Sequence, residues 1–72
     1  MNKLYLLEWF LTIEGLKQQM LFSDKEVAEE KYLVLKDVIR HGWLCLEELV
    51  EKDVEAGFVK GEVLHYNDIS RL

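Results

Sequence analysis

The chain has 72 residues, a hydrophobic fraction of 50%, a charged fraction of 32% and a net charge of −5 at pH 7. Half of the residues are apolar and proline is absent, which excludes a disordered tail and indicates an ordered globular chain. A chain of this length holds one domain with a small core, so we expect a single α+β domain over residues 1–72.

The cysteine and histidine content argues against a disulfide and a structural metal, two features that commonly stabilise small domains. Cys45 has no partner for a disulfide within the chain, which is typical of a reducing compartment. His41, His65 and Cys45 have no zinc-type spacing, and we expect no metal and no cofactor. Glu8 interrupts the apolar N-terminus, which is too short to span a membrane and precedes no signal-peptide cleavage site. We therefore expect a cytoplasmic protein that contacts no membrane.

The acidic excess is concentrated in the last third of the chain. Residues 43–72 carry seven acids and three bases, whereas residues 1–22 carry two of each and residues 23–42 carry five acids and four bases. Phosphate binding needs clustered Lys and Arg side chains, so this distribution argues against a nucleic-acid partner.

Residues 3–13 predict a first strand, because they are rich in aromatic and branched side chains and place apolar residues on both faces at period two. A helix through the same residues is the alternative. Gly15 marks a turn, and residues 17–22 would return antiparallel to complete a hairpin.

An S-x-x-E capping box at Ser23 and Glu26 predicts a helix from about residue 24 to residue 41, with Gly42 as its C-terminal glycine. Leu33 should face water. The side chains expected to face the sheet are Val27, Ala28, Leu35, Val38 and Ile39.

Residues 43–56 leave two alternatives open, a strand or a second helix that ends at Gly57. Residues 58–66 read as extended, with Gly61 at a turn or bulge, and a short apolar finish follows in Ile69 and Leu72. The pattern predicts a small antiparallel sheet in ββαββ order, with one amphipathic helix packed on one face.

With the sequence G-W-L-x-L at 42–46 and V-L-H-Y-N-D-I-x-x-L at 63–72, the chain resembles a loose class of short Gram-positive and phage-encoded proteins. Those proteins have ββαββ order, an acidic helix of E-E-A-E-E type and a similar final strand. The resemblance is strongest over residues 24–40 and 63–72. Most members have no assigned activity, so the resemblance implies an architecture and a phage or prophage origin, and it implies no chemistry.

Each group that could be catalytic has a structural interpretation. Ser23 lies where a helix cap belongs and has no base nearby in the sequence. His41 and Cys45 are four residues apart, but Gly42 between them disfavours a shared helix. We therefore expect no enzyme.

The acidic run over residues 47–55 is the candidate partner surface. It is either a solvated face or an electrostatic landing site for a basic protein. Its acids are Glu47, Glu48, Glu51, Asp53 and Glu55. The sequence thus predicts a non-catalytic protein–protein interaction module, an accessory or inhibitory protein of a phage or prophage. The alternative is a winged-helix DNA-binding regulator, in which residues 43–56 would form an acidic recognition helix and residues 57–66 the wing.

The first strand is apolar on both faces, and one helix can cover only one of them. An uncovered apolar face usually marks a contact site, so we expect a homodimer, which would also stabilise so small a core. The candidate self-association residues are Tyr5, Leu7, Trp9 and Leu11.

Overall fold

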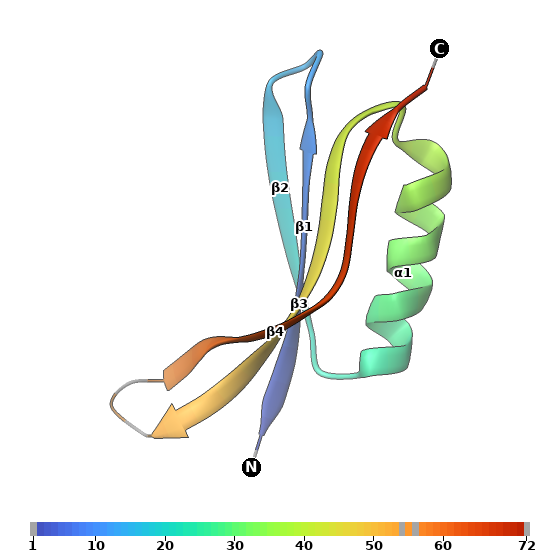
Figure 1. Cartoon of the computed structure of the whole chain (residues 1–72). Helices are drawn as coiled ribbons and strands as arrows, with labels where there is room; N and C mark the ends of the chain where they lie inside the picture. The colour runs from blue at the N-terminus through green and yellow to red at the C-terminus, as the bar shows by residue number, and fades with distance from the viewer. Residues whose placement is uncertain (1, 54, 56, 72) are drawn as a thin grey trace.

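The computed structural model describes residues 2–53, 55 and 57–71. The chain has an α+β fold, in which one helix packs on a four-stranded antiparallel sheet (Figure 1). The elements in chain order are β1 (Lys3–Leu11), β2 (Leu16–Phe22), α1 (Lys25–Val38), β3 (His41–Asp53) and β4 (Gly57–Ser70). Across the sheet the order is β2, β1, β3, β4, so β2 and β4 form its two edges.

The predicted first hairpin is confirmed, and the helical alternative for residues 3–13 is wrong. β1 pairs with β2 in one unbroken register from Tyr5 opposite Phe22 to Leu11 opposite Leu16. The turn contains Gly15, whose φ of 64° lies in the left-handed region that glycine adopts without strain. The period-two alternation in β1 therefore places its odd-numbered side chains on the face that α1 covers.

The start of α1 differs from the prediction by one cap residue. Asp24, not Ser23, is the N-cap, and its carboxylate accepts hydrogen bonds from the backbone N–H of Glu26 at 2.8 Å and of Val27 at 3.4 Å. Aspartate caps as well as serine does, and its charge also suits the positive end of the helix dipole.

The end of α1 comes earlier than predicted. Ile39 is already extended, with φ −68° and ψ 130°, although its N–H still donates to the Leu35 carbonyl at 2.9 Å. Gly42, predicted to end the helix, lies in β3. The chain therefore turns from helix to strand within residues 39–41.

The buried stripe of α1 is narrower than predicted. Val27 and Val38, predicted to face the sheet, are 48% and 65% exposed, so these two expectations are wrong. Leu33 is exposed, as expected. Positions separated by four, three and four residues form a stripe only one side chain wide, and the two valines lie on its flank. The stripe consists of Ala28, Tyr32, Leu35 and Ile39.

The core lies between this stripe and the two central strands. Leu7 of β1 pairs across the sheet with Leu46 of β3, and both are fully buried. The edge strand β4 is tied to the helix by a hydrogen bond from the Asn67 amide to the Tyr32 hydroxyl. The remaining buried core members are Trp9, Leu44 and Ile69.

Residues 43–53 belong to β3, so the helical alternative for this part of the chain is wrong. β3 pairs with β4 over most of its length, with register shifts between Leu46 and Glu47, between Glu47 and Leu49, and between Glu51 and Asp53. Extra residues in a ladder bend and twist the strands. The far part of the β3–β4 hairpin accordingly projects away from the region that α1 covers (Figure 1). Leu72 lies outside the described residues.

No helix in the described part of the chain is long and apolar enough to cross a membrane.

Candidate functional site

Apolar side chains remain exposed along one flank of α1. On the opposite flank, the Glu29 carboxylate lies 3.0 Å from the His65 imidazole of β4. Val38 lines a groove together with Gln18 of β2, so the flank that carries Val38 faces β2. Helical spacing places two more exposed side chains on this flank, Val27 at 48% and Val34 at 55% exposure.

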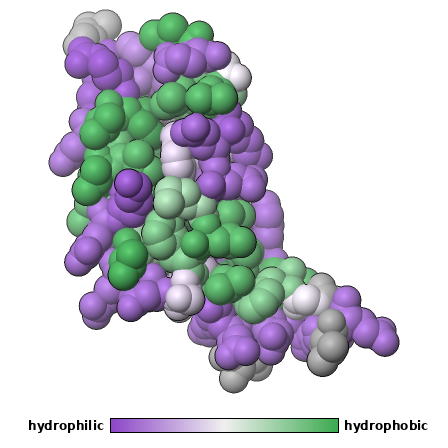
Figure 2. Space-filling view, turned by 180° about the vertical axis from the view of Figure 1, so that it is seen from behind, coloured by the Kyte–Doolittle hydropathy of each residue, from purple (hydrophilic) through white to green (hydrophobic). Residues whose placement is uncertain are grey.

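The edge strand β2 adds exposed apolar side chains next to this flank. Leu16 and Met20 are register partners of Leu11 and Leu7, so they lie on the face of the sheet where α1 packs. They are nevertheless 45% and 40% exposed, because α1 lies mainly over β1 and β3. Figure 2 shows hydrophobic side chains spread over the helix and the adjacent strands on this side of the molecule.

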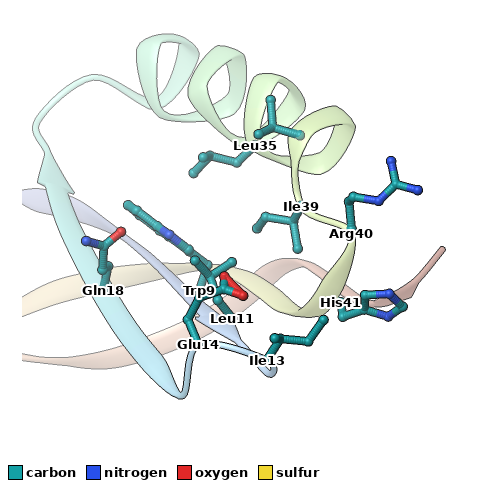
Figure 3. Close-up of a pocket in the computed structure, with 10 residues that line it drawn as sticks. Trp9, Leu11, Ile13, Glu14, Gln18, Leu35, Ile39, Arg40 and His41 are labelled. Atoms are coloured by element: carbon teal, nitrogen blue, oxygen red, sulfur yellow. The ribbon is translucent and has the colours of Figure 1, made fainter. Parts of the chain in front are cut away.

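A groove of about 510 Å³ opens between the C-terminal half of α1 and the β1–β2 hairpin (Figure 3). Trp9 and Leu11 of β1 form its floor, with Leu35 of α1 and Ile39, directly after the helix, above them. Ile13, at the hairpin turn, is 76% exposed. Polar groups stand at the rim of the groove, namely Glu14, Gln18, Arg40 and His41. A groove with an apolar floor and a polar rim can accept large apolar side chains of a partner and orient them through the rim.

The opposite face of the sheet carries a buried polar cluster. The Glu8 carboxylate, buried in β1, lies 3.2 Å from the Lys17 ammonium and accepts a 2.9 Å hydrogen bond from the Gln19 amide. Burial alone would raise the pKa of the Glu8 carboxyl. The hydrogen bond from Gln19 and the hydrogen bond and positive charge of Lys17 outweigh burial, so the pKa lies below its usual range. Glu8 is therefore an ionised structural group that joins β1 to β2.

Cys45 and Glu47 belong to the same cluster. The Cys45 thiol donates to the Glu47 carboxylate at 3.9 Å, and the Lys60 ammonium lies 3.8 Å from that carboxylate. Burial and the negative charge of Glu47 raise the pKa of the Cys45 thiol, so the unreactive protonated form prevails at neutral pH. The described residues contain no group of three side chains placed to hold a metal ion.

The residues of the predicted acidic surface do not share one face. Glu47 is buried on the open face with Lys60, while Glu48 points to the other face, where the Lys3 ammonium lies 3.3 Å from its carboxylate. Lysines therefore already neutralise two of the five acids. The other three lie toward the end of the β3–β4 hairpin, namely Glu51, Asp53 and Glu55.

The helix α1 covers the face of β1 that carries the predicted self-association residues. Tyr5, Leu7, Trp9 and Leu11 all face α1. Leu7 is 0% and Trp9 8% exposed, because the helix covers the odd-numbered side of the strand. Those two residues are core, so this part of the prediction is corrected, whereas the homodimer itself stays a prediction.

The exposure of this flank of α1 was not predicted from the sequence. A helical wheel places Val27, Val34 and Val38 in the same broad apolar arc as the true stripe. The spacing of the stripe residues by four, three and four positions could have predicted the exposure. It defines a buried stripe narrower than the apolar arc and leaves the three valines beside that stripe.

Comparison with protein-family models, with curated proteins and with solved structures gives no match, so a function for this chain rests on its own residues.

Proposed function

We propose that this protein is a non-catalytic protein-binding module whose contact surface is the groove together with the adjoining flank of α1 and face of β2. One observation carries the proposal: large apolar side chains remain exposed in the groove, at Ile13 and Val38, and on the flank of α1 and the face of β2 that adjoin it. Exposed apolar surface of this kind, with polar residues around it, often marks a contact site. The exposed residues are Ile13, Leu16, Met20, Val27, Val34 and Val38.

The extent of this surface favours a protein segment over a small molecule. A compact ligand would occupy the groove floor at Trp9 and Leu11, and would leave Val27 and Met20 exposed. A partner segment with an apolar stripe would cover the groove and its surroundings together, as amphipathic helices do in apolar grooves. The proposed ligand is therefore an amphipathic segment of another polypeptide.

The polar groups of the open face support a binding role over a catalytic one. Catalytic acids and nucleophiles need pKa values near the working pH. Here Glu8 is held ionised, while the Cys45 thiol is held protonated, which is the opposite of what an acid and a nucleophile require.

The groove also has more support than the acidic run as the contact surface. Glu47 and Glu48 each hold a lysine of the same chain, so a basic partner would have to displace those lysines first. The winged-helix alternative has no support from residues 43–53, which form a strand in place of the required recognition helix.

Selection of short peptides from a random display library tests this proposal. We expect selected peptides to carry large apolar residues at helical spacing and to change the fluorescence of Trp9, measured in a Trp43→Phe background so that Trp9 is the one indole present. Val38→Glu should weaken binding by about tenfold or more, because it places a charge at the groove wall.

Leu33→Glu is the matched control, since Leu33 is similarly exposed but lies on the other side of the helix. It should leave peptide affinity unchanged. Equal losses in the two variants, or selected peptides that bind without any change at Trp9, would refute the groove as the contact surface.

A further inference from the structure

The two edges of the sheet differ in regularity. β4 meets its neighbour with three register shifts, whereas β2 pairs with β1 without any. Bulges protect an edge strand from pairing with another chain because they twist its free hydrogen-bonding groups out of line. In the described part of the chain no strand covers the outer edge of β2, so a straight run of backbone donors and acceptors is left available there.

The side chains of β2 also lack the usual protection. Edge strands are commonly guarded by charges. Lys17 is the one charged residue of β2, and its ammonium is already engaged by Glu8 of the same chain. Leu21, on the open face of the sheet, is 58% exposed, and Met20 is 40% exposed on the other face. The edge is therefore flanked by apolar side chains above and below.

We propose that a second copy of this chain occupies this edge, with the two β2 strands paired antiparallel about a two-fold axis at Gln19. The pairing joins two four-stranded sheets into one continuous sheet with both helices on the same face. This inference rests on the backbone edge of β2, whose residues Leu16 and Met20 also belong to the proposed contact surface.

Symmetry and charge together select the register. In an antiparallel pair, directly opposed side chains lie on the same face of the sheet. A two-fold axis perpendicular to the sheet must therefore pair one residue with its own copy, and cannot pair two consecutive residues with each other. With the axis at Gln19, all seven residues of β2 are paired, and Lys17 lies opposite Leu21 of the second copy. No like charges meet in this register. The remaining pairs are Leu16 with Phe22 and Gln18 with Met20.

The absence of acids from β2 explains why a chain with net charge −5 can pair with itself at this edge. Residues 16–22 contain one base and no acid, so no acid of either copy lies within the paired segment. A standard interface covers about 800 Å² per partner, and the surface of one chain is 5051 Å². An interface of standard size would therefore bury about one-sixth of the surface of each chain, and the strand edge and its flanking apolar side chains would have to provide that area.

Light scattering with size-exclusion chromatography at micromolar concentration tests the dimer. We expect twice the mass of 8.6 kDa that one chain has. Leu21→Lys should weaken dimerisation by about tenfold, since it sets a lysine opposite Lys17 of the second copy at two symmetric places. Leu21→Glu should preserve or strengthen the dimer for the opposite reason, and circular dichroism verifies that each variant is folded.

Cysteine crosslinking tests the axis itself in a Cys45→Ser background. Directly opposed strand residues have Cα atoms close enough for a disulfide. Gln19→Cys should therefore give a covalent dimer on mild oxidation, while Leu33→Cys, on the far flank of α1, should not. A mass of one chain, a dimer that responds equally to both charges at position 21, or no crosslink at position 19 would overturn the proposal. The peptide selection with Val38→Glu and Leu33→Glu tests the groove separately.

Discussion

Gly42 of β3 lies directly against the backbone of Phe10 in β1, so close that a Cβ atom at position 42 would stand 1.7 Å from the Phe10 carbonyl oxygen. The glycine also has a φ of 153°, a conformation that side chains rarely adopt. Gly42→Ala should therefore force the two central strands apart. We expect a loss of more than about 3 kcal/mol in the free energy of unfolding, measured by urea denaturation.

Gly15 provides the control for this prediction. Its φ is also positive, at 64°, but a Cβ there would meet nothing within 4 Å. Gly15→Ala should cost only about 1 kcal/mol, the strain of a left-handed residue. If the two alanine variants unfolded at the same urea concentration, the close approach of Gly42 to Phe10 would not account for any loss of stability.

Two neighbouring residues of α1 test its helical phase. Ala28 is fully buried against the sheet, whereas Val27 is 48% exposed on the flank. Ala28→Asp should abolish cooperative unfolding, because it buries an unpaired carboxylate in a small core. Val27→Asp should change stability by less than about 1 kcal/mol, helped by an acid's favourable place in the first helical turn. Thermal melts followed by circular dichroism distinguish the two, and the reverse order would show that the phase is wrong.

Glu8 makes stability depend on acid pH in a defined direction. Its pKa is lowered in the folded chain from the usual 4.5, so its ion pair stabilises the fold above that value. The contribution should fade as the pH falls below 4.5 toward the folded pKa. Lys17→Met removes the charge and hydrogen bond of Lys17 and should move the Glu8 titration midpoint upward, as followed by NMR of its side-chain carboxyl carbon. A Glu8 midpoint above 4.5 in the parent protein would contradict this interpretation.

The first hairpin was predictable because every signal in it is local. The aromatic and apolar content of β1 favours a strand over a helix, and a glycine at position 15 indicates the turn. The helix start was predictable to within one residue for the same reason. Both Ser23 and Asp24 are good caps, and the choice between them depends on how the chain leaves β2.

Residues 43–50 could not be assigned locally, because their apolar positions satisfy a strand and a helix equally well. The strand is selected by partners that are distant in sequence, such as Leu7 opposite Leu46 and Trp9 opposite Leu44. The groove was equally hidden. Whether Val38 is buried depends on how the helix is placed over the sheet. The helix lies mainly over β1 and β3, so Val38, on the side toward the edge strand β2, stays exposed.

Position-specific photocrosslinking tests most directly whether the groove is where this protein meets another polypeptide. A benzophenone amino acid would replace Val38 at the groove in one variant and Leu33 on the far side of α1 in another, each expressed in the cells that naturally produce the chain. The proposed function predicts that the probe at position 38 forms an adduct with a polypeptide other than this chain, identified by mass spectrometry, and that the probe at position 33 does not. Adducts at position 33 alone, or at neither position, would contradict it.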